Sequence, residues 1–243
     1  MNKQAQGVVL LLLGGAVLKA SVTDMYLRYV KEGLQPFLIG AGVVLVAAAV
    51  MTLIYDFRAD RGTADQDDDG HDHGGTPHHE PRVGWLLILP VLGLLLVAPP
   101  ALGSFAAGQA GTALASQEVS EYAALPEGDP AVISVLDYAS RAVFDEGRSL
   151  GERRVQVTGF IAAGAGGEPI LARMILSCCA ADGRPIKIGM AGNAPVGLPA
   201  DTWVEVTGRY TDRTGTDAVN GERIPFIDVE TWVEVPPPRN QYE

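Results

Sequence analysis

The sequence predicts two structural classes in one chain: a membrane α-helical N-terminal part with three spans, then a small all-β, OB-like barrel preceded by one helix. Residues 1–107 contain long apolar blocks, whereas residues 109–243 have the mixed composition of a soluble domain. From Arg153 onward apolar residues recur at every second position, as in strands. The predicted order is two transmembrane helices in 1–55, a disordered loop in 56–84, a third transmembrane helix in 85–107, a linker in 108–130 and the barrel domain in 131–243.

Three apolar blocks are candidates for crossing a bilayer, because about 20 apolar residues span its hydrocarbon core. The first block, 7–22, is interrupted only by Lys19, whose long side chain can reach the headgroups. The second and third blocks, 34–54 and 85–107, contain no charged residue. A cleaved signal peptide is the alternative for the first block, but no small-residue cleavage site precedes a soluble segment.

The predicted orientation depends on Lys and Arg near the helix ends, because cytoplasmic loops carry an excess of both. Arg58, Arg61 and Arg82 lie between the second and third blocks, whereas no basic residue follows the third block until Arg141. The sequence therefore predicts a multi-pass protein with the loop 56–84 in the cytoplasm and the C-terminal domain outside it.

The loop 56–84 is charged and poor in apolar residues, so it cannot form a core and is expected to be disordered. It contains every histidine of the chain, namely His71, His73, His78 and His79. Imidazole suits zinc, copper or nickel, and the neighbouring Asp carboxylates add oxygen ligands. We expect weak or transient metal binding here; the alternative is a solvated linker with no such role.

The C-terminal domain is predicted to begin with a helix over 133–147, in which Ser134 and Asp137 form a start resembling a capping box. Five short strands with Gly-rich turns then predict a closed OB-like barrel, because closure removes exposed strand edges. A sandwich is the alternative. The predicted strands are 153–161, 170–180, 184–191, 202–212 and 224–235.

The charge of this domain excludes one common use of OB barrels. Residues 109–243 contain nineteen acidic and eleven basic residues, a net charge of −8. A phosphate backbone requires a basic groove, so nucleic-acid binding is not expected.

The only two cysteines, Cys178 and Cys179, are adjacent. A disulfide between them would close a strained ring and cross-link nothing else, so a structural staple is not expected. On an extended strand their side chains would point to opposite faces, which would make one of them a small buried hydrophobe.

The functional alternative is a soft-metal or redox site at a strand end. Asp182 is close in the sequence, and Arg173 or Arg184 is expected to favour the thiolate. Catalysis by a cysteine nucleophile is not expected, because this domain has no histidine to act as a base. The prediction is a binding site without catalytic residues.

Several segments together resemble a known family. The segment "YLRYVKEGLQPFL", the His- and Asp-rich loop, the third apolar block and "VQVTGFI…RMILSCCAADGRPIKI…WVEVTGRY" are similar to the bacterial YcgQ-type family of permease subunits. The run R-x-x-x-x-C-C-x-A-D, ending at Asp182, is the most specific part. The resemblance implies an accessory protein of the bacterial plasma membrane, encoded beside a larger multi-span permease and linked to zinc or another transition metal.

Two functions are therefore expected from the sequence. The first is a non-enzymatic, membrane-anchored accessory subunit of a permease, because three spans are too few to enclose a polar pathway alone. The second is an extracytoplasmic thiol redox protein or sensor that uses Cys178 and Cys179 as a switchable pair.

Overall fold

The computed structural model describes residues 3–62, 92–93, 100–114, 122–164 and 167–243. The chain forms two compact units. One consists of Met1–Tyr26 and Glu32–Pro100, and the other of Leu27–Lys31 and Ala101–Glu243. Leu27–Lys31, in the middle of the connection between the first two helices, thus belong to the unit that contains the barrel.

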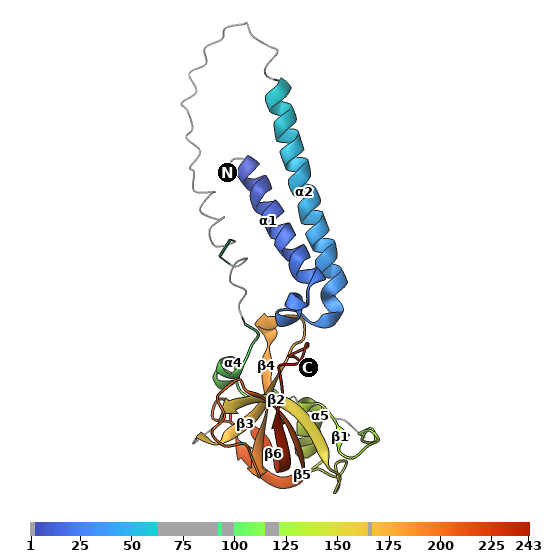
Figure 1. Cartoon of the computed structure of the whole chain (residues 1–243), viewed down its shortest axis with the longest axis vertical. Coiled ribbons are helices and arrows are strands. Elements are labelled where there is room, and N and C mark those ends of the chain that lie inside the picture. Colours follow the sequence, from blue (N-terminus) through green and yellow to red (C-terminus); the bar gives the residue numbers. More distant parts are fainter. Residues whose placement is uncertain (1–2, 63–91, 94–99, 115–121, 165–166) are drawn as a thin grey trace. The chain divides into compact units, whose positions relative to one another are not determined.

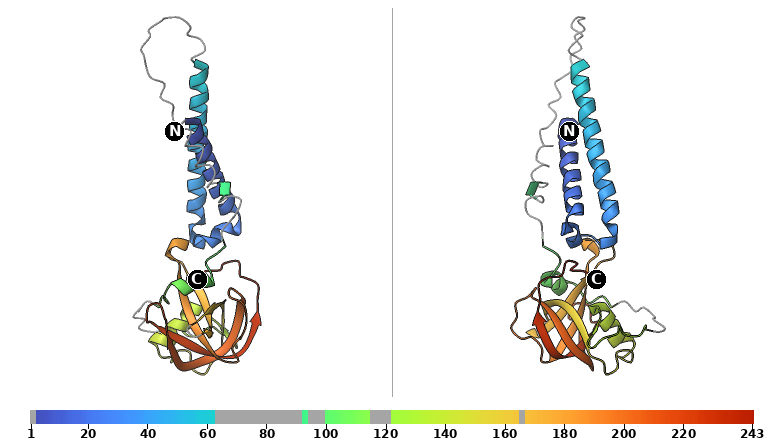
Figure 2. Two further views of the ribbon diagram at one scale, coloured as in Figure 1. Left: turned by 90° about the vertical axis from the view of Figure 1, so that its left-hand side faces the viewer. Right: turned by 45° about the vertical axis from the view of Figure 1, so that its right-hand side comes forward.

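The helical unit is a hairpin of α1 (Lys3–Val22) and α2 (Gln35–Gly62), which lie side by side (Figure 2). Glycines allow the two backbones to approach closely. A Cβ added at Gly14 would lie 2.8 Å from Val46, and one added at Gly42 would lie 2.8 Å from Leu18. Such small residues at a helix contact are typical of membrane helix pairs.

The structure reproduces the prediction of three membrane spans only in part. Among the described residues one helical stretch is long and apolar enough to cross a membrane. It is Glu32–Asp56, which includes most of α2, whereas the apolar stretch of α1, Gln6–Val22, is shorter. Most of the third predicted span lies outside the described residues. Its last residues, 104–107, form part of a short helix, α4 (Ser104–Gln109), that packs on the barrel. The apolar pattern alone does not separate a lipid-facing alanine from one that faces a protein core.

The second unit contains a closed five-stranded barrel (Figure 1). The strands pair in the order β2-β3-β4-β6-β5, and β5 pairs back onto β2. The pairing of β4 with β6 is parallel and the other barrel pairings are antiparallel, which is compatible with an OB-like barrel. A strand is found at each of the five predicted places, although the second ends at Ile175 and not at Ala180: β2 (Val155–Ala163), β3 (Pro169–Ile175), β4 (Arg184–Gly192), β5 (Trp203–Thr216) and β6 (Arg223–Glu234). A short strand that was not predicted, β1 (Ala131–Val132), pairs in parallel with β2.

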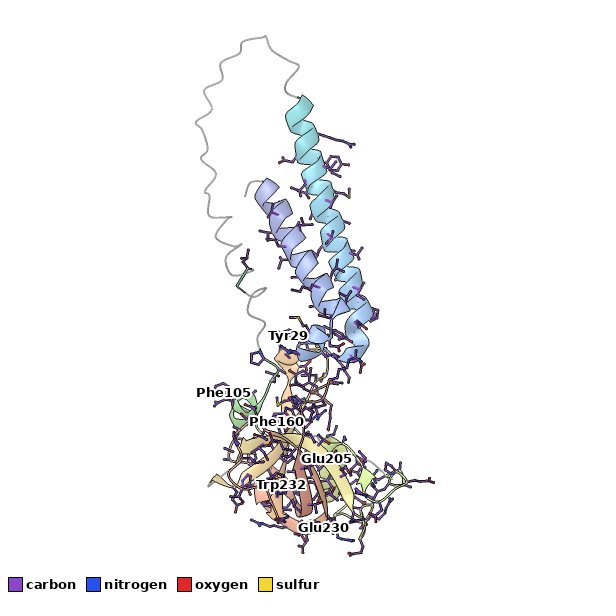
Figure 3. All side chains as sticks on the ribbon, in the orientation of Figure 1. Tyr29, Phe105, Phe160, Glu205, Glu230 and Trp232 are labelled. Carbon is purple, nitrogen blue, oxygen red and sulfur yellow. The ribbon has the colours of Figure 1, made fainter. Side chains whose placement is uncertain are left out.

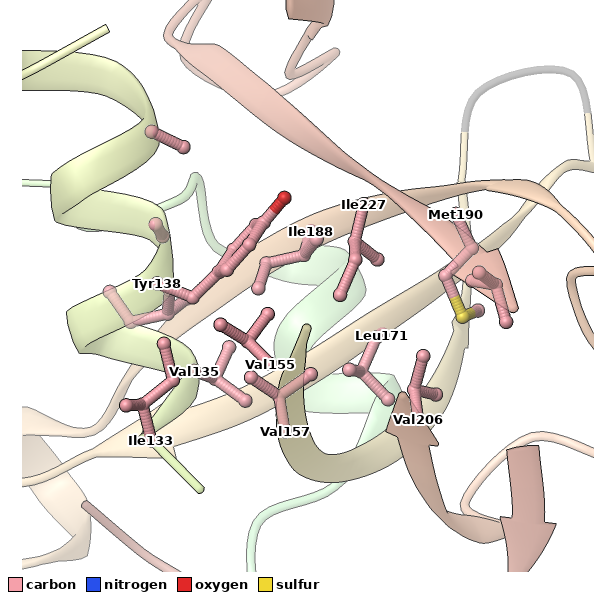
Figure 4. Packing of buried hydrophobic residues seen from close by; sticks show 14 of the residues in the cluster. Ile133, Val135, Tyr138, Val155, Val157, Leu171, Ile188, Met190, Val206 and Ile227 are labelled. Carbon is pink, nitrogen blue, oxygen red and sulfur yellow. The ribbon is translucent and has the colours of Figure 1, made fainter. Parts of the chain in front are cut away.

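The predicted helix is α5 (Val135–Phe144), and its start is confirmed because the Ser134 side chain accepts a hydrogen bond from the N–H of Asp137. Tyr138 is fully buried and reaches from α5 into the core of the barrel, where it packs with residues such as Val155 and Ile188 (Figure 4). Its hydroxyl donates a 2.7 Å hydrogen bond to the carbonyl of Phe226. The aromatic ring thus fills the core while its polar atom has a partner.

A second apolar cluster lies outside the barrel core. It contains Ala107 of α4, Phe160 of β2, Met174 of β3 and Tyr242 near the C-terminus. Phe105, also on α4, is instead exposed (Figure 3). These contacts cover part of the outer surface of β2 and β3.

Part of the predicted linker also packs on the barrel. The N–H of Ala113 donates to the carbonyl of Pro185, and the buried Lys187 ammonium lies 2.8 Å from the carboxylate of Asp217. Lys187 also donates to the carbonyl of Ala110, and Asp217 accepts from the N–H of Thr112. The segment 110–113 is therefore anchored by a closed polar network.

Candidate metal centre

Cys178 and Cys179 lie in the connection between β3 and β4. β3 ends at Ile175, and a short 3₁₀ helix, η5 (Ala180–Asp182), follows the cysteines. The prediction that the pair sits on a strand with its side chains on opposite faces is therefore wrong. The cysteines follow the end of β3 and lie close to Asp182, and a metal or redox site there stays a prediction.

Asp182 explains why the strand stops. Its carboxylate accepts hydrogen bonds from the N–H groups of Ser177 at 2.8 Å, Cys178 at 2.8 Å and Cys179 at 3.3 Å. These hydrogen bonds fold the chain into a turn directly after the last β3–β4 pair, Ile175 and Arg184. The Asp182 side chain reaches back over η5 in a capping-box arrangement with Cys179. One carboxylate thus folds the two cysteines into a tight turn.

The turn brings three metal-ligand atoms together. The two sulfur atoms and a carboxylate oxygen of Asp182 all lie within 4.8 Å of one another. Zinc–sulfur bonds are about 2.3 Å long, so two sulfurs in a tetrahedral zinc site lie about 3.8 Å apart. Cys178 is exposed, and Cys179 and Asp182 are partly buried. The ligand set is thus near the spacing of a zinc site and remains open to solvent.

Hydrogen bonding sets the protonation of the centre. The pKa of Cys178 is raised to about 11, mainly because its thiol donates to the Asp182 carboxylate and also because it contacts Cys179. The same thiol bond, together with the backbone N–H groups, lowers the pKa of Asp182 to about 2. Without metal the centre therefore holds a thiol and a carboxylate at neutral pH, and a bound cation must displace the thiol proton.

The two arginines do not act on Cys178 as expected. Arg173 is buried; its guanidinium donates to the carbonyls of Thr158 and Asn240 and lies over the ring of Trp203. Arg184 is exposed at the start of β4. The pKa of Cys178 is raised rather than lowered, so the prediction of an arginine-stabilised thiolate is wrong for this residue. Proximity in sequence does not show where a guanidinium finds its acceptors.

Sequence reasoning missed one partner of the turn. Val30 forms an antiparallel bridge with Cys179, the N–H of Lys31 donates to the carbonyl of Cys178, and the N–H of Ala180 donates to the carbonyl of Tyr29. A single valine in a short polar segment carries no strand signal, because alternation needs at least four residues to be seen.

The four histidines, His71, His73, His78 and His79, lie outside the described residues. Metal binding by their loop stays a prediction. Within the part of the chain that the structure describes, the turn at Cys178, Cys179 and Asp182 is the one group of such ligands close enough to share an ion.

Comparison with known proteins identifies a family. Residues 5–113 match the DUF1980 N-terminal domain, and residues 143–243 match the DUF1980 C-terminal domain. The chain therefore belongs to the DUF1980 family. No curated protein and no solved structure matches it. The two family descriptions name no ligand, activity or partner.

Proposed function

We propose that this DUF1980 protein is a membrane-anchored, non-enzymatic accessory subunit of a larger multi-span permease. In this proposal it binds zinc, or another thiophilic transition metal, at Cys178, Cys179 and Asp182. The observation that carries the metal assignment is the convergence of two sulfurs and a carboxylate oxygen within 4.8 Å. Their convergence depends on backbone hydrogen bonds to Asp182, so little of the ligand set has to be ordered when the ion arrives.

The chemistry of the donors favours zinc among common ions. Thiolate sulfur is a soft ligand that calcium and magnesium do not select, and zinc accepts both sulfur and carboxylate oxygen. Three protein ligands leave a fourth tetrahedral position open, and Cys178 is exposed. An open, exposed site is suited to an ion that is exchanged, whereas structural zinc sites are closed by four protein ligands.

The second candidate, a thiol redox protein or sensor, uses the same cysteines. Exchange between thiols and disulfides requires a thiolate, and reactive cysteines have a lowered pKa. The pKa of Cys178 is instead raised to about 11 by its hydrogen bond to Asp182. A metal ion also requires the thiolate, but it can displace the thiol proton and gains the Asp182 carboxylate as a further ligand, so metal binding is the use that the whole cluster favours.

The membrane anchor is supported by the long apolar helix Glu32–Asp56, whose most apolar window is only 11% buried within the protein. A core helix of a soluble domain would be covered, so lipid is the solvent that suits this helix. Two or three spans cannot enclose a polar path, which favours a role beside a multi-span partner. The location of the C-terminal unit outside the cytoplasm follows from the distribution of Lys and Arg.

The test is a zinc titration of the full-length protein in detergent, in competition with a chromophoric chelator. The four loop histidines are replaced by Gln in every sample, so that the loop cannot contribute. We expect one tight site that is lost in Cys178→Ser, Cys179→Ser and Asp182→Asn, with melting temperatures within a few degrees of the parent. A parent protein that binds no zinc would contradict the proposal. Recovery of a multi-span permease after gentle membrane solubilisation tests the partner separately.

A further inference from the structure

The turn that carries the cysteines has two sets of hydrogen-bond partners. One is the Asp182 carboxylate, and the other is the segment 28–31, whose Tyr29 is labelled in Figure 3. Lys31 donates its N–H to the carbonyl of Cys178 at 3.1 Å, and Tyr29 accepts from the N–H of Ala180 at 2.7 Å. The two hydrogen bonds flank Cys179, so this residue is fixed by backbone contacts before and after it.

Tyr242 holds the segment 28–31 in place. Its side chain is buried, and its hydroxyl donates to the carbonyl of Arg28 at 2.8 Å and accepts from the N–H of Leu102 at 2.9 Å. Tyr242 is itself fixed to β3 by a parallel bridge with Met174.

The next residue continues this pairing toward the cysteines. Glu243 donates its N–H to the carbonyl of Met174 at 3.0 Å, and its carbonyl accepts from the N–H of Leu176 at 3.2 Å. One hydroxyl thus connects the segment 28–31 to the strand that leads into the turn.

From these contacts we infer that residues 28–31, which the Tyr242 hydroxyl holds in place, position the backbone of the cysteine turn for metal binding. The inference rests on the proposed function. Groups that orient metal ligands without touching the ion typically change affinity by about 10–100-fold when removed. Tyr242 is a positioning residue in this sense, because no atom of it belongs to the ligand set.

The inference has a consequence for the membrane hairpin. Residues 27–31 lie within the connection between α1 and α2. If pairing with this segment raises metal affinity, a bound ion must strengthen the pairing by the same factor, since coupling between two equilibria is reciprocal. Metal binding at the centre is thereby coupled to how firmly the segment between the two helices pairs with the cysteine turn.

The first test compares Tyr242→Phe with Tyr138→Phe in the full-length protein with the four loop histidines replaced. Both changes remove a buried hydroxyl that donates to a backbone carbonyl and leave the ring in place. We expect Tyr242→Phe to weaken zinc binding about tenfold or more, and Tyr138→Phe to leave it within about twofold.

Two further readouts separate positioning from general stability. Hydrogen exchange at the amides of Lys31 and Ala180 should become faster in Tyr242→Phe and slower when zinc is added to the parent protein. In the Co²⁺-loaded protein, the thiolate-to-metal charge-transfer absorption should change in Tyr242→Phe and not in Tyr138→Phe. A variant that only lost stability would not alter that absorption.

A second matched pair keeps the test decisive if Tyr242→Phe fails to fold. Lys31→Pro deletes the N–H that donates to Cys178, and Lys31→Ala keeps it. We expect weaker zinc binding in the proline variant alone. Unchanged affinity in the folded variants, while the parent binds zinc, would overturn this inference and leave the proposed function standing. A parent protein without zinc affinity would overturn both.

Discussion

Two carboxylates of the C-terminal unit show how differently the same group can be used. Asp217 is buried and saturated: it pairs with Lys187 and accepts from the N–H groups of Thr112 and Val219. Asp182 accepts three N–H groups but borders two thiols, one of them exposed. The first carboxylate already has a buried cation as its partner, whereas the second hydrogen-bonds a thiol whose proton a cation can replace. The difference indicates that a fixed counter-cation, and not the number of hydrogen bonds, separates a structural carboxylate from a binding one.

The largest effect is expected from breaking the saturated network. Lys187→Met keeps the length of the side chain but leaves Asp217 buried without its cation. Removing one partner of a buried pair typically costs about 3–5 kcal/mol in stability. Denaturant unfolding of the C-terminal unit should therefore shift strongly, while zinc affinity of the folded protein stays unchanged.

A matched control lies on the surface, where Arg209 pairs with Glu230 at 2.7 Å and both side chains are substantially exposed. Arg209→Met should cost less than about 1 kcal/mol, because water screens such pairs. Equal losses of unfolding free energy in the two variants would show that the buried Lys187–Asp217 pair stabilises the unit no more than an exposed pair does.

The second prediction concerns the other carboxylate. Asp182→Asn removes the charge that holds the Cys178 proton, so the thiol pKa should fall from about 11 toward its ordinary 9.0. Two pKa units change the thiolate population at neutral pH up to about a hundredfold. Alkylation of Cys178 at pH 7 should accelerate accordingly, measured by mass spectrometry of the metal-free protein. Alkylation no faster than in the parent would show that Asp182 does not control the thiol.

The folded elements of the barrel were largely predictable, and the centre was only partly so. Alternating runs such as 153–161 reveal strands because burial of one strand face imposes a period of two. The helix at Ser134 was visible because capping is a local property. The position of Cys179 depends on hydrogen bonds to Asp182 and on a bridge to Val30, a residue almost 150 positions away. Neither hydrophobic period nor spacing encodes such a contact.

A third prediction follows from the pH dependence of the centre. Because the pKa of Cys178 is raised, its thiol stays protonated at neutral pH, and the rate at which Cys178 is alkylated in the metal-free protein should rise about tenfold per pH unit up to about pH 11. The pKa of Asp182 is about 2, so its carboxylate stays charged throughout. Zinc affinity should also rise with pH below about pH 9, where free zinc begins to form hydroxide, since binding releases the thiol proton. A rate that levels off near pH 8 would contradict the hydrogen-bonded thiol.

The smallest effect is expected from the histidine loop. Replacing His71, His73, His78 and His79 by Gln should leave zinc affinity at the cysteine turn within about twofold, because the sequence predicts only weak metal binding by the histidines and the turn has its own ligands. A peptide of residues 65–82 should bind zinc or nickel weakly by itself. If the peptide shows no affinity in a competition titration, the tract is only a linker.

The central claim is that zinc is held by the cysteine pair and Asp182. X-ray absorption at the zinc edge, on the full-length protein with the loop histidines replaced, reports the ligands directly. The account predicts two sulfur ligands at about 2.3 Å, with oxygen ligands completing the shell, and loss of sulfur scattering in the Cys178→Ser, Cys179→Ser double variant. A shell of only nitrogen and oxygen around bound zinc would contradict it.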